Sequence, residues 1–132
     1  MWGRRWLEAL EPHDADPVER ALDAVHTAPA GQPLPPETAR AGLAASEVVA
    51  ASLGAPAPGL PAPARTLAER CAPRLRALRD RARAAVERIH HGPPSGDPSD
   101  LWDEPDAATE QADADARDWR TEMDLLTRRL AD

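Results

Sequence analysis

Two adjacent histidines, His90 and His91, are the residues of this sequence best suited to metal binding or proton transfer. Neighbouring side chains on a helix point about 100° apart, so both rings cannot bind one ion from a regular helix. Such a site needs a frayed helix end and help from His13, His26 or a carboxylate. We favour a simpler role, in which these basic groups stabilise the C-terminus of a helix, and we predict no bound metal.

Glu47 is the only charged residue between Ala41 and Ala64. On a helical wheel it lies within about 20° of Arg40, two turns earlier, so the two define one narrow polar stripe. We expect this stripe to mark the edge at which the helix meets water. Two alternatives stay open. Glu47 can form an ion pair with an arginine of the following basic helix, or act in catalysis in a cavity shared with His90 and His91.

Cys71 is the single cysteine of the chain and lies among apolar positions. We expect a buried small hydrophobe, because no neighbouring base with an orienting group is visible in the sequence. The sequence contains no Gly-rich phosphate loop, CxxC, HExxH or GxSxG motif. No cofactor is therefore predicted, although catalytic groups scattered along a sequence escape a search for local motifs.

Arginine is concentrated in one segment, residues 65–91, which carries eight Arg against three acids. Residues 97–132 have the opposite balance, four Arg against twelve acids. The two segments can neutralise each other, or the basic face of Arg76, Arg79 and Arg83 can bind a partner. Nucleic acid is disfavoured because the segment lacks aromatic residues that stack on bases, and the net charge is −7. The partner we expect is another protein or a second copy of this chain.

Trp102 is the least explained of the four tryptophans, because acids flank it in a loop-like segment. It can anchor the acidic loop to the rest of the protein. Alternatively it forms an exposed hot spot for a partner, a role in which tryptophan is enriched.

The composition predicts an all-α fold. The chain has no Phe and no Tyr, and its fifteen prolines disfavour strands because proline cannot donate within a sheet. Alanine, the strongest helix former, dominates. We predict one domain over residues 1–132, a compact antiparallel bundle of five or six helices.

The expected helices are read from apolar periodicity and from capping residues. A short helix covers Trp2 to Leu10, and a second starts at Asp16, with Asp16 as N-cap and Glu19 in a capping box. The apolar helix 37–53, ending before Gly54, is expected at the centre of the bundle.

The second half of the chain alternates linkers and long helices. Residues 55–64 form a Pro-rich internal linker, and a basic helix follows that Pro73 kinks or divides. Beyond Pro73 we expect one long helix, 74–90. An acidic loop, 91–106, then leads to a last helix, 108–130, whose apolar residues repeat as an a/d seam: Ala112, Ala116, Trp119, Met123, Leu126 and Leu130.

Several features predict a bacterial, cytoplasmic protein. A lone cysteine fits a reducing compartment, and the N-terminal segment lacks the apolar run of a signal peptide. No apolar stretch is long enough to span a membrane without a break. All sixteen basic residues are arginine, which is typical of GC-rich bacterial genomes.

The order of several motifs resembles one bacterial family. These are "AASEVVAASLG", then "LP", a basic helix ending near "AAVERI", "SDLWDE", and a terminal "WRTEMDLLTRRL". The chain resembles the domain-of-unknown-function family numbered 4259 from about Trp6 to Leu130. The usual Trp-Gly opening and the Phe- and Asp-containing stretch of that family are reduced here, since "MWG" runs almost directly into "RRWLEALE". The resemblance implies a fold and no activity.

Together these patterns predict a non-catalytic protein–protein interaction or regulatory module. The alternative is an enzyme that depends on a metal or a small molecule, with Glu47, His90 and His91 in a site between helices.

Overall fold

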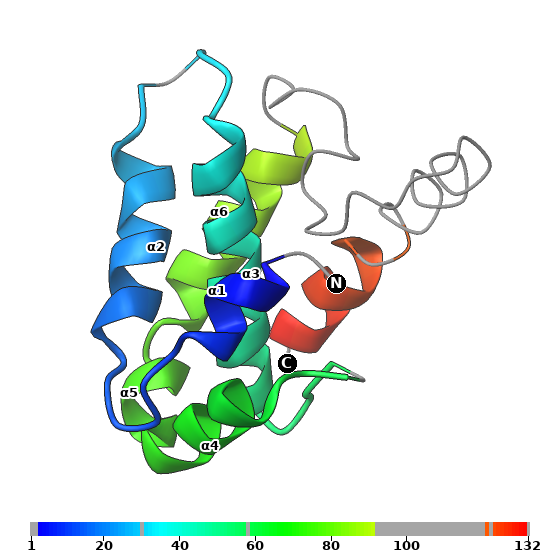
Figure 1. Ribbon diagram of the computed structural model, residues 1–132. Helices are drawn as coiled ribbons and strands as arrows, with labels where there is room; N and C mark the ends of the chain where they lie inside the picture. Colours follow the sequence, from blue (N-terminus) through cyan, green and yellow to red (C-terminus); the bar gives the residue numbers. More distant parts are fainter. Residues whose placement is uncertain (1–2, 30, 58, 92–120, 122, 132) are drawn as a thin grey trace, which may run out of the picture.

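The computed structural model of the protein describes residues 3–29, 31–57, 59–91, 121 and 123–131 (Figure 1). Within these ranges the chain forms helices and no strand. The helices are α1 (Arg4–Glu8), α2 (Asp16–Thr27), α3 (Pro36–Ser52), α4 (Ala62–Arg70), α5 (Ala72–Arg76), α6 (Arg79–His91) and a C-terminal helix, 123–130. The all-α prediction is confirmed, and the helices pack as a compact bundle.

α3 is the central helix of this bundle. All nine residues from 42 to 50 are buried, so the helix is covered on every side. It packs against each of the five other labelled helices, α1, α2, α4, α5 and α6. Its sequence explains this position, because a helix that is apolar nearly all round is stable only when neighbours surround it. The predicted central helix, 37–53, is confirmed.

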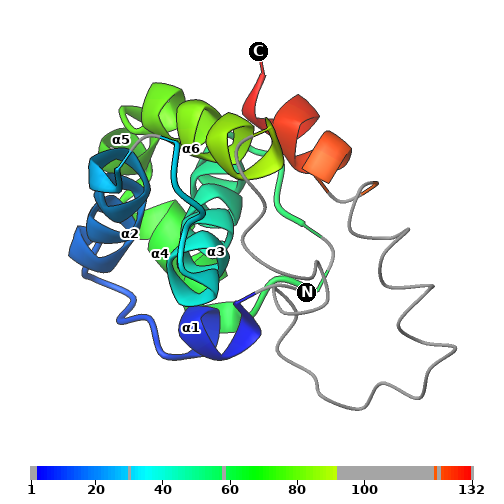
Figure 2. The same ribbon diagram turned by 90° about the horizontal axis from the view of Figure 1, so that it is seen from above.

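Three long helices form the antiparallel heart of the bundle. α2 and α6 run in the same direction and α3 runs between them in the opposite one (Figures 1 and 2). α2 contributes the predicted stripe of Val18, Leu22 and Val25, all fully buried. α6 contributes its own buried stripe, which consists of Ala82, Ala85, Val86 and Ile89.

The C-terminal helix packs on the opposite side of α3 from α2 (Figures 1 and 2). Its buried residues are Met123, Leu126 and Leu130, which are fully excluded from solvent. They are the last three positions of the predicted a/d seam. The earlier positions of that seam, and the rest of the predicted helix 108–130, lie outside the described residues.

The end of α3 shows the turn that its sequence predicts. Gly54 has a positive φ of 92°, a conformation that favours glycine. Its backbone N–H donates to Ala51 O at 3.0 Å, and the N–H of Ala55 donates to Ala50 O at 3.1 Å. This pair of bonds is the Schellman arrangement that closes a helix C-terminus. Gly54 is therefore the C′ residue, as predicted.

The predicted long helix 74–90 is wrong, because the chain divides this region into α5 and α6. α4 ends at Arg70, since Pro73 has no N–H and its ring would collide with the carbonyl four residues back. A second break follows at residues 77–78, where the N–H of Leu78 donates to Leu75 O at 2.9 Å. This tight turn contains no Gly or Pro, so the sequence pattern did not reveal it.

The N-terminal helices also differ from their predicted starts. α1 covers Arg4–Glu8, a shorter span than Trp2 to Leu10. α2 begins at Asp16, but Ala15 is its N-cap and makes no side-chain cap hydrogen bond. Asp14 Oδ1 instead accepts the N–H of Asp16 at 2.9 Å. The predicted capping box is wrong because the Asp16 carboxylate, together with that of Glu19, binds Arg74.

The remaining predicted segments are only partly described. α4 begins at Ala62, inside the predicted linker 55–64, where Leu60 is also buried. The predicted acidic loop, 91–106, starts at the last residue of α6, and its residues 92–106 lie outside the described ranges. None of the helices in the described ranges combines the length and the apolarity that crossing a membrane requires.

Gly42 lies where α3 closely approaches both α2 and α6. A Cβ added at Gly42 of α3 would lie 2.7 Å from Val25 Cγ2 of α2 and 3.3 Å from Ile89 Cδ1 of α6. The shorter distance involves a β-branched side chain with little rotamer freedom. Glycine at this position therefore allows α2 and α6 to pack directly on α3.

We predict that Gly42→Ala destabilises the protein by about 1–3 kcal/mol, the usual cost of overpacking a core. At an exposed helix position the same replacement stabilises a protein by up to about 1 kcal/mol. A loss of unfolding free energy at residue 42 therefore indicates overpacking. Urea unfolding followed by circular dichroism measures the difference. An unfolding free energy equal to or above that of the wild type would show that α2 and α6 do not meet at Gly42.

Candidate functional site

Glu47 lies inside the protein and forms an ion pair with the C-terminal helix. Its side chain is 2% exposed and that of Arg129 is 15% exposed. Arg129 Nη2 donates to both carboxylate oxygens, at 2.8 Å to Oε1 and 3.0 Å to Oε2. A charge with so little solvent access requires a partner of opposite charge. Arg129 supplies that charge from a position 82 residues further along the chain.

The prediction that Glu47 marks a wet edge is wrong, since the residue is 1% exposed. At Glu47 the C-terminal helix covers the polar stripe of α3, whereas Arg40 is half-buried. The alternative of an ion pair predicted the right kind of interaction with the wrong helix, since the partner is Arg129 and not an arginine of 65–91. A helical wheel shows which residues share a face, but it does not show which distant element packs on that face.

One further polar atom of this pair is buried. Among the described residues Arg129 Nε has no hydrogen-bond partner, although it is shielded from solvent. A buried donor without an acceptor costs about 1–3 kcal/mol. The unsatisfied Nε offsets part of the stability that the ion pair gives to the buried Glu47 carboxylate. We infer that the main effect of the pair is to fix where the C-terminal helix packs on α3.

A hollow of about 220 Å³ lies between α6 and the C-terminal helix. α6 contributes Arg83, Val86, Glu87 and His90, and the C-terminal helix contributes Thr127 and Leu130. We call these six residues the α6 hollow. On a helical wheel the four α6 members fall within about 100° of each other, so they share one face of the helix. The site combines a positive charge, a negative charge, an imidazole and a hydroxyl with two apolar side chains.

Two polar groups of the α6 hollow remain able to bind a ligand. Within the described part of the chain, Arg83 has no ion-pair partner, and its side chain is exposed. Thr127 Oγ1 donates its proton to Met123 O at 2.8 Å, which leaves the oxygen lone pairs as acceptors. The hollow thus offers a cation at one position and an acceptor on its other wall.

Most other arginines of the basic segment bind the protein itself. Arg76 Nε donates to Ser52 O at 2.8 Å and satisfies a carbonyl at the end of α3. Arg88 does the same for α2, because its Nη1 donates to Val25 O and its Nη2 donates to Pro29 O at 2.9 Å. These arginines hold helix ends in place.

Arg74 and Arg81 join α2 to α5 and α6 through surface ion pairs. Arg74 Nη2 donates to Glu19 Oε2 at 2.8 Å and also to Asp16 Oδ1, and Arg81 Nη1 donates to Glu19 Oε1 at 3.1 Å. The hydrogen bond from Arg74, followed by that from Arg81, lowers the pKa of Glu19 below its ordinary value of 4.5. The bonds from Glu19 and Asp16 in turn raise the pKa of Arg74. The network is therefore charged at neutral pH.

The structure separates the predicted binding residues. Arg76 caps α3, Arg79 is the first residue of α6, and Arg83 lines the hollow. Trp102 lies outside the described residues. Of these three arginines, Arg83 is therefore the one that the structure places at the hollow.

The residues of the alternative site also have different positions. His90 lines the α6 hollow, whereas Glu47 does not and is bound to Arg129. His91 ends α6, and its side chain lies outside what the structure describes. Cys71 is half-buried against the core and was predicted to be buried. In the described ranges, no three His, Cys, Asp or Glu side chains lie close enough together to hold a metal ion.

Sequence reasoning did not identify the hollow as a site, because Thr127 and Leu130 meet α6 only in the folded chain. A usable signal was present in α6, where Arg83, Glu87 and His90 recur on one face at spacings of four and three residues. The missing information was which helix packs beside that face.

Comparison with known proteins places the chain in a family. The model for the domain of unknown function DUF4259 matches residues 3–115, and the chain belongs to this family. The matched range includes Glu47, Arg83 and His90 and ends before the C-terminal helix, 123–130. Searches of curated proteins and of solved structures found no match.

We predict that Arg129→Met destabilises the protein by about 3 kcal/mol, because it removes the ion pair that compensates the buried Glu47 charge. This value is the lower end of the range for buried pairs, since Arg129 keeps some solvent access. The double variant Glu47→Met/Arg129→Met removes both charges and should recover most of the loss. Urea unfolding of the two single variants and the double variant measures this coupling. Additive losses in the double variant would show that the pair is not coupled.

Proposed function

We propose that this member of the DUF4259 family is a non-catalytic protein–protein interaction module that binds its partner at the α6 hollow. The observation that carries the proposal is the hollow between α6 and the C-terminal helix, where the exposed Arg83 has no ion-pair partner among the described residues. Interface hot spots have this character, with a side chain of the partner seated in a pocket and a polar group at its rim.

The size of the hollow supports a protein ligand over a cofactor. Its volume of about 220 Å³ is below the roughly 300–1,000 Å³ of pockets that hold drug-sized ligands. A space of this size accommodates one side chain with its adjoining backbone. Much of a partner would then lie outside it, on the exposed surfaces of α6 and the C-terminal helix.

The contacts of the arginines support a protein partner over nucleic acid. Arg74, Arg76, Arg81 and Arg88 bind carboxylates or carbonyls of α2, α3 and the loop after α2. The guanidinium groups of these four side chains therefore already bind groups of the protein. Affinity for nucleic acid depends on the number of phosphates that free cations can neutralise.

The rival proposal, an enzyme with Glu47, His90 and His91 in one site, has less support. Glu47 is bound by Arg129 and does not line the hollow to which His90 belongs. For the location of the protein we propose the bacterial cytoplasm, because a lone half-buried cysteine suits a reducing compartment.

The proposal is tested with a photo-crosslinking amino acid in place of Thr127, in the wall of the hollow. The control carries the same group at Ala24, an exposed position on α2, on the other side of α3. Irradiation in cells followed by mass spectrometry should yield adducts with another protein chain at position 127 only. Arg83→Glu should abolish these adducts, because it reverses the charge at the rim.

The outcomes separate the alternatives. A crosslink between two copies of this chain at position 127, lost with Arg83→Glu, identifies self-association as the interaction. Equal adducts at positions 24 and 127, or adducts that persist with Arg83→Glu, would contradict binding at the hollow.

A further inference from the structure

We propose that α6 is the contact surface of a homodimer, in which a second copy of this chain lays its own α6 antiparallel on it across a two-fold axis. This inference rests on the proposed function and names the partner that binds beside the α6 hollow. Two reciprocal ion pairs, each between Arg83 of one copy and Glu87 of the partner subunit, fix the register of the two helices.

The side of α6 that faces away from the core carries four exposed residues, which we call the outer face of α6: Asp80, Arg83, Ala84 and Glu87. On a helical wheel they fall within about 100° of each other. The opposite side of the helix is buried in the core. One flank is bound to α2 and the loop after it, through Arg81 and Arg88. The outer face is therefore an exposed surface that a second chain can contact.

Arg83 and Glu87 carry the two charges of the outer face that are left for a partner. Neither side chain forms an ion pair with any other residue of the described ranges. They lie four residues apart, but a base followed by an acid is the less favourable order for a pair within one helix. Asp80 has a local role instead, because a carboxylate in the first turn of α6 stabilises the helix dipole.

The two charges are placed symmetrically about the middle of the helix. α6 extends over 13 residues, Arg79–His91, so residue 85 is its midpoint. Arg83 and Glu87 each lie about 3 Å along the helix axis from that midpoint, on opposite sides of it. A two-fold axis at this level, perpendicular to two antiparallel copies of α6, places each Arg83 opposite Glu87 of the partner subunit. In the same register the two helices overlap over their full length.

Ala84 lets the two helices approach each other at the same level. It is exposed and lies about 1.5 Å along the helix axis from the midpoint of α6. The distance between packed helices, about 8–10 Å, depends on the side chains at the contact. Because Ala84 has only a methyl group there, the longer side chains of Arg83 and Glu87 can reach across the interface.

The symmetry of these charges favours a second copy over an unrelated protein. In an interface with two-fold symmetry one patch contacts itself, so each contact occurs twice. A base and an acid at equal distances from the helix midpoint meet this condition. An acidic partner would also meet Glu87, and a basic partner would also meet Arg83. Since Arg83 lines the α6 hollow, the carboxylate of Glu87 of the partner subunit lies at the rim of the hollow.

A second register would place each Arg83 opposite Asp80 of the partner subunit. Its two-fold axis lies between residues 81 and 82, so the helices overlap over residues 79–84 only, which is less than half of α6. The full overlap favours the pairing of Arg83 with Glu87. The experiment separates the two registers.

Sedimentation equilibrium of the full chain, from micromolar to millimolar concentration, measures its association. The wild type should form dimers. Arg83→Glu and Glu87→Arg should each weaken the dimer by about tenfold or more, because each substitution places like charges opposite each other twice across the axis. An equimolar mixture of the two variants should form a heterodimer with nearly wild-type affinity, since both ion pairs form again with the charges exchanged.

Two controls complete the design, and circular dichroism checks that every variant is folded. Arg20→Glu reverses the charge of an exposed arginine on α2, outside the outer face of α6, and should leave the dimer unchanged. Asp80→Arg, mixed with Arg83→Glu, should not restore association to the wild-type level, because Asp80 does not face Arg83 in the proposed register.

The inference is overturned if the wild type stays monomeric at millimolar concentration, or if either charge reversal leaves the dimer unchanged. Failure of the mixture of Arg83→Glu with Glu87→Arg to associate would also overturn it. Recovery with Asp80→Arg in place of Glu87→Arg would overturn it in favour of the shorter register.

Failure of this inference is distinguishable from failure of the proposed function. Arg83-dependent crosslinks at position 127 to a different protein, together with a purified chain that stays monomeric, would leave the interaction site valid and reject only the second copy as its partner. Absence of both the crosslinks and the dimer would reject the proposed function as well.

Discussion

Burying Glu47 in the middle of an apolar helix places a negative charge where water cannot solvate it, and the position of the C-terminal helix compensates that charge. Between residues 41 and 52 α3 carries no other charge, and five helices pack against it. Arg129 brings the opposite charge within 2.8 Å of the carboxylate. A buried pair of this kind adds little net stability, but breaking it is costly, so it selects one arrangement of the helices over others.

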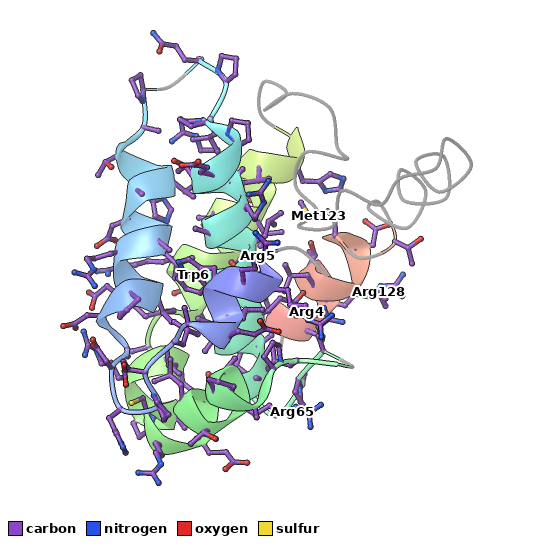
Figure 3. All side chains as sticks on the ribbon, viewed as in Figure 1. Arg4, Arg5, Trp6, Arg65, Met123 and Arg128 are labelled. Carbon is purple, nitrogen blue, oxygen red and sulfur yellow. The ribbon has the colours of Figure 1, made fainter. Side chains whose placement is uncertain are left out.

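The same arrangement creates the α6 hollow. Met123, Leu126 and Leu130 bind the C-terminal helix to the core, and Arg129 fixes its register on α3. In that register Thr127 and Leu130 lie opposite Arg83 and His90. Figure 3 shows Arg128, next to the pair, projecting outward from the same helix. In this short helix Arg128 thus faces solvent, Arg129 binds the buried carboxylate, and Leu130 lines the hollow.

The fold was predictable from the sequence to the extent that its signals are local. Apolar stripes located α2, α3 and the C-terminal helix, and Gly54 located the end of α3. The environment of Glu47 was not predictable in this way, because Arg129 is 82 residues away and the stripe of α3 looks equally like a solvent edge. The break between α5 and α6 lacks Gly and Pro, and the hollow depends on a long-range contact. Sequence patterns therefore identified most faces, and the folded chain determined their partners.

Hydrogen exchange at the backbone amides of 123–130 tests the central claim most directly, namely that the Glu47–Arg129 pair holds the C-terminal helix on α3. Glu47→Gln keeps the size of the side chain and removes its charge. We expect exchange in 123–130 to rise on the order of a hundredfold, which corresponds to about 3 kcal/mol, while the amides of α2 keep their protection. Unchanged protection in 123–130, or an equal loss in α2, would contradict this claim.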